Sequence, residues 1–177
     1  MLRVLSLVRS SSIGISLISY NRGAWCDVIV DVNDEAIWNK HRDELTRYAS
    51  ALVGPDDAED LVSAVVVRVL NRRRLSDLED ARSYLYRSVL NEARSLVRRR
   101  RRRRLQPGFD VLPADVEPEI LSAVLDLPSR QRAAIYLTHW RDLPVSEVAD
   151  LMGCRPGSVK RYLHIARNRL REVFDDD

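Results

Sequence analysis

Apolar and polar residues alternate at helical spacing from residue 34 onward, and Gly54 and Pro55 separate the first two helical segments. Residues 34–52 place their apolar side chains on one broad face, and Asp34 is a candidate N-cap. Pro55 suits the first turn of a second helix over about residues 55–70, where the opening acids would meet the positive end of the helix dipole. Its apolar positions follow the i, i+3, i+4, i+7 pattern of a helix with one buried face: Ala58, Leu61, Val62, Val65, Val66 and Val69.

The third helical segment ends in a run of consecutive arginines at residues 98–104. Residues 71–80 break the periodicity and predict a loop, after which a long helix is expected from about Ala81 to Arg103. Like charges within four residues of one another repel on a bare helix, so the run needs phosphate nearby or frays. A disordered basic tail is the alternative. Because the run continues an amphipathic helix, the pattern favours phosphate binding.

A linker separates this first part of the chain from a second helical part. Residues 105–117 contain prolines, a glycine and acids without periodicity. Pro118 then opens a further helix, which Pro128 ends. The next helix is expected to begin with Ser129 as its N-cap and to continue to about Trp140. The side chains expected to face inward from it are Ala133, Ala134, Leu137 and Trp140.

The sequence around Gly153 has the spacing of a helix-turn-helix. A short helix is expected over residues 145–152, and a longer helix starts near Gly157. Gly153 tolerates the positive φ that the turn needs, and the small side chain of Ala149 lets the two helices cross closely. Val159 would fill the gap between them.

The second helix of this motif would present polar and basic side chains to the major groove of DNA. The side chains near its start, or in the turn before it, that would face outward are Arg155, Ser158, Lys160, Arg161 and His164. A helical hairpin can share part of this pattern without binding DNA. The basic outer face favours DNA binding.

Residues 1–33 differ from the rest of the chain. Their short apolar clusters are interrupted by Arg9 and by serines, so they form neither a membrane helix nor the unbroken core of a signal peptide. Residues 28–30 could form a short strand or nothing. We interpret this segment as a flexible extension or as the product of a start codon placed too early.

Composition limits the function classes. With 45% hydrophobic and 31% charged residues the 177-residue chain is globular, and its helical periodicity predicts an all-α fold. The net charge of +3 hides two basic patches, which suggest a polyanion contacted at two places, although charge runs can also be plain solvated surface. Cys26 and Cys154 have no metal-binding spacing and fit a reduced cytoplasmic setting. No nucleophile–base pair, metal spacing or glycine-rich phosphate loop indicates an enzyme or a cofactor.

Several stretches resemble the extracytoplasmic-function sigma factors of bacteria. Residues 57–62 and 84–94, with the arginine run that follows, resemble region two of that family. Residues 127–132, 146–154 and 157–160 resemble region four. The order of the two regions, the linker and the short length also match.

The resemblance covers about residues 36–174 and implies two small helical domains. Region two would span residues 34–104 and region four residues 118–177, joined by the linker at 105–117. It implies a sigma factor that directs core RNA polymerase to promoter DNA by reading the minus-ten and minus-thirty-five elements. Tethering the two DNA readers would raise the effective concentration of the second one.

The resemblance also implies residue roles. The helix over residues 55–70 would bind the clamp helices of polymerase through Asp57, Asp60 and Ser63. The loop at 71–80 would take in a base flipped from the minus-ten element. Tyr84, Tyr86 and Asn91 would face the melting strand, where aromatic rings stack on bases, although half-buried packing is an equal alternative for the two tyrosines. The side chains that would hold phosphates are Arg94, Arg98, Arg99, Arg100 and Arg101.

The chain departs from the family where Gln-Glu commonly follows Asp-Leu-Val, because Ser63 and Ala64 stand there, and Leu70 replaces a frequent Trp. The first change removes polar groups from the clamp contact.

The rival interpretations are a helix-turn-helix regulator that acts without polymerase, and an RNA-binding or scaffold protein that uses the arginine run alone. In the free protein we expect the domains to pack together, or an anti-sigma factor to hold them, hiding the basic faces.

Overall fold

The computed structural model describes residues 8–9, 16–17, 32–102 and 123–175, with side chains described over 32–100 and 123–172. The described part is all-α apart from one short antiparallel pair, β1 (Val8–Arg9) and β2 (Ser16–Leu17), in which Val8 lies opposite Leu17. The predictions made for residues 28–30, for Pro118 and for the linker lie outside the described residues.

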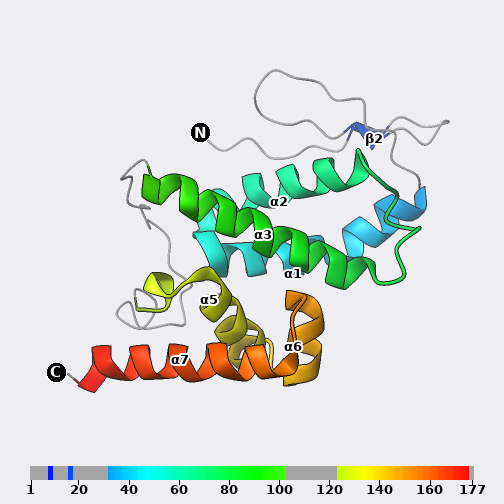
Figure 1. Ribbon diagram of the computed structural model, residues 1–177. Coiled ribbons are helices and arrows are strands. Elements are labelled where there is room, and N and C mark those ends of the chain that lie inside the picture. Colours follow the sequence, from blue (N-terminus) through cyan, green and yellow to red (C-terminus); the bar gives the residue numbers. More distant parts are fainter. Residues whose placement is uncertain (1–7, 10–15, 18–31, 103–122, 176–177) are drawn as a thin grey trace.

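Three helices form the first half of the fold (Figure 1). They are α1 (Val32–Val53), α2 (Pro55–Leu70) and α3 (Ala81–Arg102), close to the bounds that periodicity predicts. Their apolar faces meet in one core, and Gly54 makes the sharp α1–α2 turn at a φ of 93°. Pro55 occupies the first turn of α2 as expected.

The prediction that Asp34 caps α1 is wrong. The helix begins two residues earlier, at Val32, and Asp34 is only 3% exposed inside its first turn. The Asp34 Oδ1 atom accepts a hydrogen bond of 2.8 Å from the Ser76 backbone N–H, so this side chain ties the 71–80 loop to α1. Leu75 anchors the same loop because its side chain is fully buried.

Asp80 supplies the N-terminal cap of α3. Its Oδ1 atom accepts a hydrogen bond of 2.9 Å from the Ser83 backbone N–H. Hydrogen bonds from Ser83 favour the carboxylate and hold the pKa of Asp80 below its usual value.

The second half contains a helical turn at residues 123–126, then α5 (Ser129–Ile135), the π-helical turn η1 (Tyr136–Trp140), α6 (Val145–Met152) and α7 (Pro156–Asp175). Ser129 is not a cap: the N-cap position of α5 belongs to Pro128, and no side chain caps it.

The prediction that Trp140 faces inward is also wrong. Leu137 is fully buried, but Trp140 is 47% exposed. The Arg141 N–H bonds back to the Tyr136 carbonyl, five residues earlier, so this turn holds more residues than an α-helical turn. An α-helix with 3.6 residues per turn would place Trp140 on the buried face. The wider turn rotates the residues after Leu137 away from that face, so Trp140 points outward.

The two halves pack against each other. In Figure 1, α5, α6 and α7 lie beneath the layer made by α1, α2 and α3. Helix α6 packs on α3, and α5 packs on both α1 and α3. Buried side chains of both halves join into a single cluster, from Leu45 and Tyr48 to Val148 and Val159.

Candidate nucleic-acid interface

Helices α6 and α7 form the helix-turn-helix that the sequence predicts. Gly153 ends α6 in the left-handed region, with φ 61° and ψ 49°, and the Cys154 N–H bonds to the Ala149 carbonyl at 2.9 Å. Ala149 and Val159 are buried where the two helices meet. The geometry predicted for all three positions, Gly153, Ala149 and Val159, is confirmed.

The outer face at the start of α7 is polar and positive. Ser158 is half-buried, whereas the other predicted residues are exposed: Arg155, Lys160, Arg161 and His164. The positive end of the α7 helix dipole adds positive potential at the same place. This face can contact a phosphate backbone and base edges together. Its role in DNA binding stays a prediction.

The expectation that packing of the two halves hides the basic faces is wrong for α7. Lys160, Arg161 and His164 remain exposed although α6 packs on α3. The packing covers the tyrosine side of α3 instead.

Tyr86 is fully buried, which contradicts the prediction that it faces a melting strand in this arrangement. Its ring centroid lies 4.8 Å from that of Tyr48, and the Tyr48 ring lies 5.8 Å from that of Tyr136 in the second half. Burial raises the pKa of both Tyr48 and Tyr86 far above the usual tyrosine value. Tyr84 is half-buried, with the Arg73 guanidinium 5.2 Å from its ring centroid.

The arginine run is partly neutralised within the protein. Arg68 and Arg99 both bind the Glu92 carboxylate, at 2.6 Å and 3.1 Å. Burial opposes ionisation of Glu92, but these two hydrogen bonds prevail and lower its pKa. Arg100 forms an ion pair with Asp57. The sequence pattern did not predict these pairings, because Asp57 lies on α2 and Glu92 lies about two turns before Arg99 on α3.

The remaining predicted residues of α3 are available to a ligand. Asn91 and Arg98 are exposed and Arg94 is half-buried. The side chain of Arg101 lies outside the described residues.

The predicted polymerase contacts on α2 differ in exposure. Asp60 is exposed and Asp57 is half-buried by its pairing with Arg100. Ser63 is 6% exposed and lies in the core, so its hydroxyl cannot serve as a surface contact in this arrangement. The helical register places position 63 on the inner side, between Val62 and Val66.

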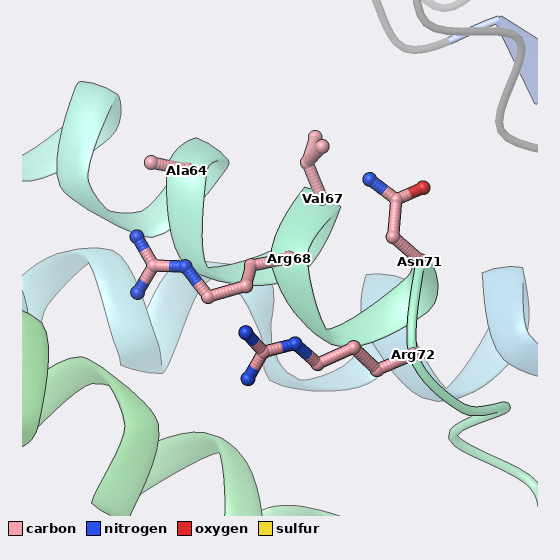
Figure 2. A pocket seen from close by; sticks show the side chains of 5 residues that line it. All are labelled: Ala64, Val67, Arg68, Asn71 and Arg72. Atoms are coloured by element: carbon pink, nitrogen blue, oxygen red, sulfur yellow. The ribbon is translucent and has the colours of Figure 1, made fainter.

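Sequence reasoning missed an open hollow of about 400 Å³ at the C-terminal end of α2. Figure 2 shows its lining: Ala64, Val67, Arg68, Asn71 and Arg72. The guanidinium groups of Arg68 and Arg72 extend on the same side, while Val67 and Asn71 point away from them. The small Ala64 side chain leaves this space open. The departure from the family pattern at this position was the one feature of the sequence that pointed to the hollow.

The described residues contain no group of three His, Cys, Asp or Glu side chains arranged to hold a metal ion. Within the same residues, none of the helices is long and apolar enough to cross a membrane.

Comparison with known proteins decides the family. Residues 37–103 match the family model of Sigma-70 region 2, and residues 118–170 match that of Sigma-70, region 4. The RNA polymerase sigma-E factor of Streptomyces antibioticus is 31% identical over 152 residues, which cover 80% of this chain and 84% of the relative. The chain belongs to the sigma-70 family, among the extracytoplasmic-function sigma factors.

A second relative carries the name of the extracytoplasmic-function (ECF) subfamily. The ECF RNA polymerase sigma factor SigE of Mycolicibacterium smegmatis is 32% identical over 157 residues, 80% of this chain and 61% of the relative. The chain is therefore a sigma factor of transcription initiation, and the comparisons do not support a regulator that acts without polymerase.

Two solved structures share the fold. The sigma factor RpoE of Bartonella quintana, crystallised with the anti-sigma factor NepR, aligns with a TM-score of 0.65 and 24% identity over 82% of this chain and 98% of its own. CnrH, in complex with the cytosolic domain of CnrY, aligns with a TM-score of 0.58 and 24% identity over 81% and 88% of the two chains.

Proposed function

We propose that this sigma factor acts in the cytoplasm, where it directs core RNA polymerase to promoters. Residues 118–177 would read the minus-thirty-five element as duplex DNA, and residues 34–104 would read the melting minus-ten element and bind polymerase. The linker at 105–117 would let the two readers occupy separate elements. Like RpoE, which was crystallised with the anti-sigma factor NepR, the chain would be restrained by such a partner.

The observation that carries the proposal is the outer face of α7. Val159 is fully buried behind the helix, while Lys160 and Arg161 are exposed beside the positive helix terminus. A buried apolar side and an exposed basic side at the start of the second helix are what a recognition helix requires.

Mapping transcript start sites after overexpression tests the proposal in cells. New start sites should share two sequence elements upstream, at the positions of the minus-ten and minus-thirty-five elements. New transcripts without a shared pair of elements would count against promoter reading by two domains.

Arg161→Ala should weaken binding to promoter duplex about 10- to 100-fold while leaving polymerase binding intact, because a base-edge contact contributes roughly 1–3 kcal/mol. Fluorescence anisotropy with a labelled duplex, and gel filtration with core polymerase, measure the two affinities. The matched control is Arg171→Ala, which removes the same charge from an exposed position far along α7 and should change duplex affinity much less. Equal losses from both variants would contradict a local reading face.

Asp60→Ala should have the opposite effect, weakening polymerase binding about tenfold and leaving duplex binding unchanged. Asp60 is exposed on α2, and loss of one charge-assisted contact at an interface accounts for a change of this size. Asp126→Ala removes an exposed acid from the second half and serves as control. If Asp60→Ala leaves the affinity for core polymerase at the control value, the α2 surface is not the polymerase contact.

A further inference from the structure

The loop between α2 and α3, residues 71–80, is fixed to the first half of the fold at two adjacent positions. Leu75 is fully buried, and the next residue, Ser76, donates its backbone N–H to the Asp34 Oδ1 atom at 2.8 Å. The Leu78 N–H bonds back to the Leu75 carbonyl at 3.1 Å and closes a turn around this point. In Figure 1 the loop accordingly lies beside the N-terminal end of α1.

Asp34 is the only acid among the described residues whose side chain lies in the buried class. A carboxylate loses hydration when it is buried, so it needs hydrogen bonds from the protein. Asp34 does not cap α1, which begins two residues earlier. Its Oδ1 atom accepts instead from a backbone N–H that lies 42 residues further along the chain. The contact therefore serves the loop and not the start of the helix.

The outer side of the loop carries groups suited to single-stranded DNA. Arg72, Arg73 and Arg74 are exposed. The Arg73 guanidinium lies 5.2 Å from the centroid of the Tyr84 ring, which is half-buried in the first turn of α3. Guanidinium groups attract a phosphate backbone, and an aromatic ring stacks on an unpaired base. The loop thus has its anchors on the core side and its cationic groups on the solvent side.

We propose that Asp34 is a positioning residue for promoter recognition, whose carboxylate holds the 71–80 loop in the shape that receives an unpaired DNA base. This inference rests on the proposed function, in which the first half reads the melting strand. A flexible loop would lose conformational entropy when it became ordered on DNA, and that loss weakens binding. A loop already fixed by Asp34 avoids the loss, and its defined shape discriminates between base sequences.

Hydrogen exchange of the Ser76 amide tests the tether in the full-length free chain. Asp34→Ala removes the acceptor and should speed exchange about tenfold. Asp34→Asn keeps an oxygen that can accept the same hydrogen bond and should stay close to the wild-type rate. Leu45→Ala is the control for lost stability, because Leu45 is buried later along α1 and a loop amide exchanges by local opening. Mass spectrometry of peptides from residues 71–80 follows the exchange.

Binding of single-stranded DNA by the holoenzyme, assembled from core RNA polymerase and this chain, tests the role in recognition. The probes are two labelled oligonucleotides of equal length. One carries the non-template minus-ten sequence of a promoter mapped by overexpression, and the other carries that element scrambled. Asp34→Ala should lower the ratio of the two affinities about tenfold, whereas Asp34→Asn and Leu45→Ala should keep the wild-type ratio. A change that only destabilised the fold would lower both affinities together and leave their ratio unchanged.

Three results would overturn the role of Asp34. They are a wild-type exchange rate in Asp34→Ala, faster exchange with an unchanged affinity ratio, and an Asp34→Asn variant that loses the ratio as fully as Asp34→Ala. Circular dichroism checks that the variants retain their helices. A wild-type holoenzyme that binds both oligonucleotides equally would contradict the proposed reading of the minus-ten element, and this inference with it. Failure of the Asp34 tether alone leaves the wild-type preference intact, so the two failures are distinguishable.

Discussion

Val159→Asp is expected to unfold the helix-turn-helix and to abolish promoter binding. Val159 is fully buried where α6 and α7 meet, and a carboxylate placed there loses its hydration without gaining a partner. A cost of about 4 kcal/mol or more is comparable with the whole stability of a small domain. Thermal unfolding followed by circular dichroism should show loss of part of the helical signal at temperatures where the wild-type chain is folded.

Lys160→Asp is the matched control for this change. It introduces the same carboxylate one residue later, at an exposed position on the same turn of α7. Lys160→Asp should keep the thermal unfolding curve of the wild type and lose duplex affinity alone. Val159→Asp with an unchanged unfolding curve would contradict the assignment of Val159 to the core of the motif.

Arg132→Leu is expected to destabilise the chain by about 3 kcal/mol, and to loosen the packing between the halves. The Arg132 side chain is buried, and its guanidinium donates to three backbone carbonyls. One of these is Leu52, in the last turn of α1, where helix carbonyls lack partners of their own. The others are Leu125 and Leu127 of the second half. Leucine fills much of the volume but leaves these buried carbonyls unpaired, which costs about 1–3 kcal/mol for each group that water cannot reach.

Urea unfolding measures this prediction. Arg130→Leu removes the same group two residues earlier, from a half-buried side chain that donates a hydrogen bond of 3.5 Å to the Tyr162 hydroxyl. Its expected loss is below about 1 kcal/mol, as for other partly exposed polar contacts. Equal midpoints for the two variants would show that the Arg132 contacts to the carbonyls contribute little.

Steric constraints between residues that are close in the sequence were sufficient to predict the helix-turn-helix. The positive φ at Gly153, the small Ala149 at the crossing and the buried Val159 each follow from sterics within about 15 residues of chain. The bounds of the long helices were predicted for the same reason, because an apolar stripe with a period of 3.6 residues marks the buried face of one helix.

Contacts between distant segments could not be predicted in this way. Tyr86 is buried because the second half packs on α3, and the amphipathic pattern of α3 alone does not show which of its residues a distant segment covers. Trp140 is exposed because η1 departs from the α-helical period. The pairing of Arg100 with Asp57 requires the α2–α3 packing, which a charge count along the chain does not contain.

Transcription with purified components tests the central claim most directly. The chain is mixed with core RNA polymerase and a template that carries a promoter mapped by overexpression. We predict comigration of the chain with polymerase and a transcript that starts at the mapped site and depends on both promoter elements. A folded chain that binds the duplex but neither comigrates with polymerase nor supports initiation would contradict the account.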